Sequence, residues 1–309
     1  MVENMKRRKS INSKAVTGIV ILIILVVSFI GSYFVKDGFG DKLYNDAGLR
    51  DTSFGDNSTM YVSFIDVGQG NCTLVTCGDS AILVDSGEAG EAQNVINYIK
   101  NRNIDKLDCV VATHPHSDHI GGMAQILTEF EIKDVIMPEI PEDIVPTTKT
   151  YEKFLNAVAE NAENVIAAES GMTYSYGEMK LEIFAPLKDY DNLNDMSVIS
   201  RISYGETSVM FTGDATTAVE KDLLKKKNDY SADILNVGHH GSKSSSSEQW
   251  LKAVSPEYAV ICCGKGNDYG HPHSVVTERL EKFGIAFYRT DIDGTVIFAS
   301  DSRVFTKYD

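Results

Sequence analysis

The segment VVATHPHSDHIGG, residues 110–122, decides the fold because it joins an apolar run to a cluster of metal-binding side chains. The run LDCVVAT, residues 107–113, has the composition of a buried strand. The following GGMAQILTEF, residues 121–130, has the pattern of a short helix. The segment therefore predicts a strand, a polar loop and a helix in succession.

The loop of this unit has the pattern H-x-H-x-D-H. A loop at the end of a strand can present alternate side chains in a fan. We expect His114 and His116 to reach one metal ion, and Asp118 and His119 to reach a second. Imidazole and carboxylate ligands at this density predict one or two ions of Zn²⁺ or Mn²⁺.

Two further motifs can complete this site. FTGDA, residues 211–215, ends a predicted strand with Asp214, which could bridge two metal ions. VGHHGS, residues 237–242, ends another with a histidine pair, of which one imidazole can complete a metal shell while the other acts as general acid or positions the substrate. We favour His240 as the ligand and His239 beside the substrate, and the reverse assignment stays open.

Strand-like and helical runs alternate from Met60 onward, which predicts an α/β or α+β protein with layered sheets. Runs such as MYVSFIDV (60–67) and AILVDSG (81–87) are typical of strands. GEAQNVINYIKNRN (90–103) has the apolar spacing of a helix. The final segment AFYRTDIDGTVIFAS (286–300) predicts two strands around an Asp-Gly turn.

The N-terminal part predicts a membrane anchor. Residues 15–35, AVTGIVILIILVVSFIGSYFV, carry no charge, and a helix of this length spans roughly 30 Å. Basic residues precede it, so we expect a cytoplasmic segment 1–14, a transmembrane anchor 15–35, a linker 36–58 and an extracytoplasmic domain 59–309 on a single-pass cell-membrane protein. The alternatives are a buried core helix and a cleaved signal peptide.

The net charge bears on the class of substrate, and the cysteine content bears on whether the chain forms disulfides. The net charge of −15 weighs against a long polyanion such as nucleic acid, because an acidic surface repels phosphates. The five cysteines show no C-x-x-C spacing, which predicts buried free thiols, although a Cys72–Cys77 bridge stays open.

The order HPHSDH, TGD, HHGS resembles the metallo-β-lactamase superfamily, and more closely the hydrolase domain of ComEC-type DNA-uptake competence proteins. The phrases that carry the resemblance include SFIDVGQGN (63–71), NDMSVISRI (194–202), LNVGHHGSKSSSS (235–247) and GNDYGHP (266–272). The resemblance covers about residues 60–300. It implies a four-layer αβ/βα sandwich with the metals at one edge, and hydrolysis by metal-activated water.

The chain departs from this pattern in two respects. Many superfamily members have another ligand histidine between the first motif and the bridging aspartate, but here none lies between His119 and His239. Asn194 and Ser197 occupy that interval, as in the ComEC-like pattern, so the ion at His114 and His116 is expected to be held more weakly or by water. With one predicted membrane helix the chain cannot form a DNA channel alone, and the sequence does not identify a possible partner channel.

Several other residues are candidates for substrate contact or for support of the ligands. Asp66 and Gln69 are expected to organise the loop beneath the metals, and Asp85 has the same role; the alternative for each is turn chemistry. Lys243 and Lys265 could meet a substrate phosphate or remain solvated. His271, in a Gly-rich loop, is expected to contact the substrate or support a ligand, and His273 is a weaker candidate.

Together these features predict a metal-dependent phosphodiesterase or nuclease, with Asp118, His239 and Lys243 as catalytic residues and DNA as the substrate that the resemblance indicates. The runner-up is a phosphodiesterase acting on cell-envelope phosphates or phosphocholine esters. A β-lactamase or lactonase comes third. A non-catalytic module of the same fold is the remaining alternative.

Overall fold

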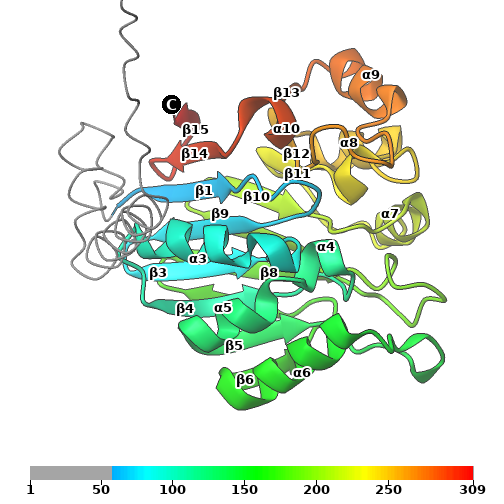
Figure 1. The fold of residues 1–309 in the computed structure, drawn as a ribbon. Coiled ribbons are helices and arrows are strands. Elements are labelled where there is room, and N and C mark those ends of the chain that lie inside the picture. The colour runs from blue at the N-terminus through cyan, green and yellow to red at the C-terminus, as the bar shows by residue number, and fades with distance from the viewer. Residues whose placement is uncertain (1–57, 309) are drawn as a thin grey trace, which may run out of the picture. The chain divides into compact units, whose positions relative to one another are not determined.

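The computed structural model describes residues 58–308, whose strands form two sheets (Figure 1). The first is an 8-stranded sheet in the order β15-β14-β1-β2-β3-β4-β5-β6. Its strands are β1 Met60–Phe64, β2 Thr73–Cys77, β3 Ser80–Val84, β4 Lys106–Val111, β5 Glu131–Met137, β6 Ala162–Ala167, β14 Val296–Ser300 and β15 Phe305–Tyr308. The strands from β15 to β3 pair antiparallel, and those from β3 to β6 pair parallel.

The second sheet has 7 strands in the order β13-β12-β11-β10-β9-β8-β7. Its strands are β7 Thr173–Tyr176, β8 Met179–Ala185, β9 Ile199–Tyr204, β10 Thr207–Phe211, β11 Ile234–Asn236, β12 Tyr258–Ile261 and β13 Ala286–Arg289. Strands β10 to β13 run parallel, and β7 to β10 run antiparallel. Each sheet therefore has a parallel half, in which the strand ends share one edge.

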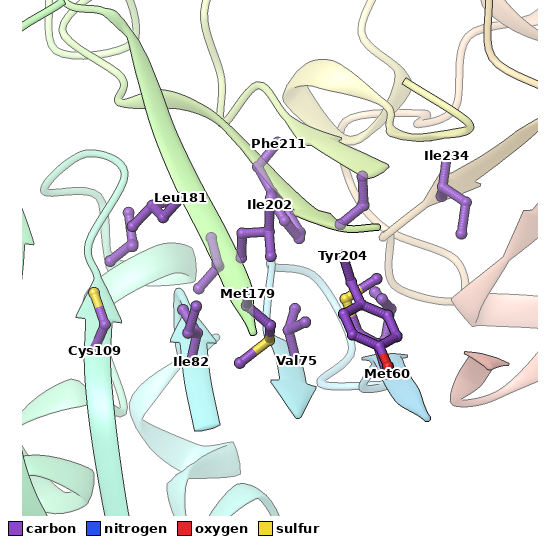
Figure 2. Packing of buried hydrophobic residues seen from close by; sticks show 14 of the residues in the cluster. Met60, Val75, Ile82, Cys109, Met179, Leu181, Ile202, Tyr204, Phe211 and Ile234 are labelled. Carbon is purple, nitrogen blue, oxygen red and sulfur yellow. The ribbon is translucent and has the colours of Figure 1, made fainter. Parts of the chain in front are cut away.

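The two sheets pack face to face around an apolar core. Figure 2 shows Met60, Val75 and Ile82 of the first sheet facing Met179 and Ile202 of the second. Strands β1, β2 and β3 in the middle of the first sheet are buried on both faces, and β3 illustrates the alternation that results. Ile82 and Val84 point into the core between the sheets, whereas Ala81 and Leu83 point to the opposite face.

Helices cover the outer face of each sheet. Helices α3 Ala92–Lys100, α4 Ser117–Ile120, α5 Met123–Glu129 and α6 Lys149–Asn161 pack on the first sheet, and α7 Thr217–Leu224, α8 Glu248–Val254 and α9 Ser274–Lys282 pack on the second. Short helices occur at η1 Ala89–Glu91, η2 Glu142–Ile144, η3 Gly238–Gly241 and α10 Thr290–Asp293. The layers run helix, sheet, sheet, helix, which confirms the predicted four-layer sandwich.

The pairing of the last two strands differs from the sequence prediction. β13 and β14 both form, but they are not partners: β13 pairs with β12 in the second sheet, and β14 pairs with β1 in the first. The Asp-Gly dipeptide ends helix α10, with Gly294 at φ 67. An Asp-Gly signal marks a chain reversal, but it does not show whether the flanking strands pair with each other.

The predicted membrane location requires correction. Among residues 58–308, no helix is both long and apolar enough to cross a bilayer. The segment 15–35 on which that prediction depended, with the flanking segments 1–14 and 36–57, lies outside the described residues.

The cysteine prediction is confirmed. Cys72, Cys77, Cys109, Cys262 and Cys263 are all buried and free. Cys72 and Cys77 therefore form no bridge with each other. Burial raises the pKa of the Cys109 and Cys262 thiols to about 12, which is consistent with inert core positions.

Candidate metal centre

One group of potential ligands consists of His114, His116 and Asp214. The first two follow β4, and Asp214 follows β10 of the other sheet. One ligand atom from each lies within 4.8 Å of the others, close enough to surround one ion. Nε2 of His114 lies 3.0 Å from Nδ1 of His116 and 3.8 Å from Oδ2 of Asp214. His114 and Asp214 are buried, and His116 is partly exposed.

A second group consists of Asp118, His119 and His240, which also meet within 4.8 Å. Nε2 of His240 lies 3.1 Å from Oδ2 of Asp118 and 3.3 Å from Nε2 of His119. Asp118 and His119 belong to α4, and His240 comes from η3 after β11. The two groups divide the first motif as the sequence predicts, with His114 and His116 in one and Asp118 and His119 in the other.

Asp214 lies between the two groups. Its Oδ1 is 3.2 Å from Nε2 of His119 and 3.7 Å from Nε2 of His240, while its Oδ2 faces His114. The Oδ1 atom is buried and has no hydrogen-bond partner within residues 58–308. The backbone N–H of Asp214 donates to Oγ of Ser197 at 3.0 Å, which anchors the backbone of this residue. This arrangement is suited to a bridging ligand.

The loop after β3 orients His119. Oδ2 of Asp85 accepts from Nδ1 of His119 at 2.7 Å and from Oγ1 of Thr113 at 2.8 Å, and Oδ1 of Asp85 accepts from the Thr113 backbone. The Ser86 backbone N–H donates to the His119 carbonyl at 2.7 Å. A proton on Nδ1 leaves the Nε2 lone pair facing Asp214 and His240.

The histidine pair forms a tight turn with left-handed backbone at both residues, with φ 53 at His239 and φ 54 at His240. Nδ1 of His240 donates to the carbonyl of Cys262 at 2.8 Å, so its Nε2 lone pair also faces the centre. His239 points beside the cluster, with Nε2 3.4 Å from Oδ2 of Asp214, and it is partly exposed. The turn therefore separates a buried histidine from one that reaches the solvent side.

The donor set fits a divalent cation. Nε2 of His119 and Nε2 of His240 face each other at 3.3 Å, although the outer nitrogen of each ring already donates elsewhere. Two lone pairs at this distance repel unless a proton or a cation lies between them. The unpartnered Oδ1 of Asp214 faces the same space. Imidazole nitrogens with carboxylate oxygens are the donors that Zn²⁺ and Mn²⁺ accept.

The charges of the site agree with this reading. Burial opposes protonation of His119 and His240, but the nearby carboxylates, Asp214 above all, outweigh it and raise the pKa of both. Burial opposes ionisation of Asp118 and Asp214, but the surrounding histidines outweigh it and lower the pKa of both. In the metal-free protein, protons therefore take the place of the cation among these groups.

A cleft of about 730 Å³ opens in front of the two groups. Its walls come from the loops at the sheet edge and from the segment around η2 and the start of α6. The lining residues are Gln69, Pro115, His116, Ser117, Asp118, Pro146, Thr148, Thr150, Leu193, Asn194, Asp214, His239, His240, Tyr269 and His271. This wall, drawn from the described part of the chain, contains no lysine or arginine.

Three of the supporting candidates line the cleft. Oε1 of Gln69 accepts from the Gly264 backbone at 3.1 Å, and its Nε2 is buried without a partner in the described chain. Asn194 borders His116, and its Oδ1 is likewise unpartnered. His271 has a buried Nδ1 with no partner there. Burial first, and then the charges of His240 and His239, lower the pKa of His271 to about 4.

Three other candidates lie elsewhere. Asp66 is exposed, and its Oδ1 accepts from the Gly68 backbone at 3.1 Å, so it follows the alternative of turn chemistry. Lys243 and Lys265 are exposed and do not line the cleft. Each lies in a motif rich in site residues, but neither side chain is part of the cleft wall. His273 accepts from the Lys243 backbone through Nδ1 at 3.1 Å.

Sequence reasoning missed part of the site. Thr113 links Asp85 to the ligand loop, and the only signal for it is its place directly before His114. Pro146, Thr148 and Thr150 form a wall of the cleft, and no motif surrounds them. Tyr269 also lines the cleft, within the phrase GNDYGHP that carries part of the resemblance.

Comparisons with known proteins agree with this fold. The profile of a family described as "Metallo-beta-lactamase superfamily" matches residues 65–265. A metallo-beta-lactamase fold protein, YhfI from Bacillus subtilis, superimposes with a TM-score of 0.51 at 16% identity, over 78% of this chain and 99% of that one.

Two curated relatives add functional context. The chain is 29% identical over 264 residues to ComE operon protein 3 of Bacillus subtilis, a match that covers 79% of this chain and 34% of that protein. It is 26% identical over 125 residues to the exodeoxyribonuclease WalJ of Streptococcus pneumoniae, which covers 39% of this chain and 42% of that protein. The chain thus spans about a third of the length of the first relative.

Proposed function

The chain belongs to the metallo-beta-lactamase superfamily, and from this membership we propose that it is a metal-dependent phosphodiesterase whose leading substrate is DNA. The observation that carries the proposal is the pair of ligand groups that share Asp214 at the floor of an open cleft. Such a set holds one or two cations next to a space that a substrate can enter.

We assign His114, His116 and Asp214 to one ion, and Asp118, His119, His240 and Asp214 to a second. Zn²⁺ or Mn²⁺ suits these nitrogen and oxygen donors. A divalent ion bound there would act as a Lewis acid toward a phosphoryl oxygen and would make water more acidic. Ser197 and Asp85 would act through Asp214 and His119, because each holds its ligand by a hydrogen bond.

His239 is our candidate for proton transfer. Its pKa is lowered, first by burial, so the ring is neutral at pH 7 and can accept or pass on a proton at Nε2. It lines the cleft beside Asp214, where the leaving oxygen of a phosphodiester would lie. Gln69 and Asn194 would bind substrate oxygens or polar edges. Lys243 has no part in this proposal, because its side chain lies outside the cleft wall.

DNA is proposed on two grounds. One relative carries the name exodeoxyribonuclease, and another is a product of a ComE operon. A phosphodiester also suits a site whose positive charge would come from metal ions alone. The net charge of −15 disfavours tight binding of a long polyanion and favours a substrate held at few phosphates.

The test is nucleotide release from end-labelled linear DNA by the full chain, loaded with Mn²⁺ or Zn²⁺. Asp118→Ala is the control, since it removes a ligand of one group while leaving the other complete. Release by the native protein and its loss in the control would support the proposal. A folded, metal-loaded protein that releases nothing from single- or double-stranded DNA would remove DNA as the substrate. Cleavage of a phosphocholine ester by the same preparation would then favour the runner-up.

A further inference from the structure

The rim of the cleft carries an exposed aromatic ring. Tyr269 is 66% exposed, the most exposed large aromatic side chain recorded in residues 58–308, although it lines the cleft. Its ring stacks on His271, with centroids 5.6 Å apart and planes at 20°. His271 in turn stacks on His240, with centroids 6.1 Å apart and planes at 28°. A series of nearly parallel rings thus leads from the candidate metal centre to solvent.

The loop that bears Tyr269 is braced. The Asn267 side chain donates to the carbonyls of Gly264 at 2.9 Å and His271 at 2.6 Å, and its Oδ1 accepts from the His271 backbone at 2.9 Å. The Gly264 backbone is held by Gln69. A ring presented on a braced loop loses little conformational entropy when a partner stacks on it.

The chemistry around Tyr269 selects the partner. The exposed ring offers a flat face on which a planar group can stack, and its contact with His271 shows that it already stacks on a planar ring. A quaternary ammonium group is usually enclosed by several aromatic rings, whereas Tyr269 is the one Phe, Tyr or Trp among the lining residues of the described chain.

We infer that Tyr269 stacks on a nucleobase next to the phosphodiester at the metal centre. This inference rests on the proposed function and adds a specificity-determining residue to it. Base stacking tolerates every base, so recognition would be general for nucleotides rather than for sequence. It would also supply affinity in a cleft without cationic side chains.

The experiment compares two single-stranded oligonucleotides on the full, metal-loaded chain. One is normal, and the other carries abasic residues at both ends. A stacked base contributes a factor of roughly 5 to 150 in affinity. We expect Tyr269→Ala to raise KM by such a factor on the normal strand and to leave KM on the abasic strand nearly unchanged. Tyr269→Phe should restore native KM. Val304→Ala is the matched control, since Val304 is 60% exposed in the turn between β14 and β15.

Other outcomes would overturn the inference. An equal rise of KM on both strands would indicate a structural role for Tyr269, and no rise on either would exclude stacking. If the native chain cleaves neither strand, the proposed function fails separately. Binding of dAMP to the metal-loaded chain then decides: binding weakened by Tyr269→Ala and restored by Tyr269→Phe supports stacking, and absent or unchanged binding overturns it.

Discussion

Nδ1 of His119 donates a hydrogen bond of 2.7 Å to Oδ2 of Asp85, and both side chains are buried. Asp85 follows β3 and His119 lies in α4 after β4, so the bond joins the ends of two adjacent parallel strands. It fixes the proton on Nδ1 and turns the Nε2 lone pair toward Asp214. A residue that binds no metal thus determines whether His119 can do so.

Asp85→Asn is therefore expected to weaken metal binding by about 10- to 100-fold. The amide keeps the shape of the side chain but loses the charge that orients the imidazole. Titration with Zn²⁺ in the presence of a chromophoric chelator would measure the change. The control is Asp134→Asn, a buried aspartate of β5 that accepts from Tyr176 of β7 and lies outside the cleft wall. Equal losses in both variants would count against an orienting role.

Substitutions of the two histidines in the turn, His239 and His240, should have different effects on metal content and turnover. His240→Ala should abolish binding to the second group, because Nε2 of His240 lies 3.1 Å from Asp118 in that group. His239→Ala should retain native metal content but lose turnover by roughly 10²- to 10⁴-fold, the usual contribution of proton transfer. Metal content by mass spectrometry and kcat on a phosphodiester would distinguish them. The reverse pattern would exchange the two roles.

Gly70→Ala should disturb the loop that carries Asp118, although Gly70 lies outside that loop in the sequence. Gly70 has φ 146, and a Cβ there would lie 2.4 Å from the carbonyl oxygen of Asp118. Gly171 is the matched control, because it has φ 98 with nothing within 4 Å of its Cβ position. Gly171→Ala should cost about 1–2 kcal/mol through backbone strain alone. Gly70→Ala should cost more in urea unfolding and also weaken metal binding; similar losses without a metal effect would contradict the close contact.

Stability without metal should be greatest near pH 6.5. His119 and His240 have raised pKa values, so the stability they contribute is complete below about 6.5, the unfolded value, and is lost as pH rises toward the folded values. His114 and His116 have lowered pKa values, chiefly through burial, so the unfolded chain takes up more protons below that pH. Stability then falls on acidification. Urea unfolding with chelator from pH 5 to 9 would show this maximum.

Bound metal should reverse the dependence of stability on pH above about pH 6.5. The ligand nitrogens of His119 and His240 must lose their protons before an ion can bind, so affinity should rise with pH above 6.5. The unfolding free energy of the protein at fixed free Zn²⁺ would then increase over the range in which the metal-free protein weakens. Parallel profiles with and without metal would show that these two histidines are not ligands.

Much of the fold could be predicted because its signals are local. The apolar run before His114 predicts β4, and the spacing of Val95, Ile96 and Ile99 predicts α3, whose buried side these residues form. The partners of the strands are harder to predict from the sequence than the strands themselves. The sequence places the last two strands around one turn, yet they belong to different sheets, since the partner of a strand is determined by packing over the whole chain.

The sequence by itself determined which candidate metal ligands the chain carries. Clustered histidines and aspartates with glycines at strand ends indicate a metal site, because few other arrangements use so many donors in so short a segment. Only the tertiary structure decided how the donors are shared. It places Asp214, which follows a strand of the second sheet, between two histidine groups, leaves Lys243 out of the cleft wall and brings Tyr269 to its rim. These relations join residues distant in sequence, and the packing of the two sheets at a common edge determines them.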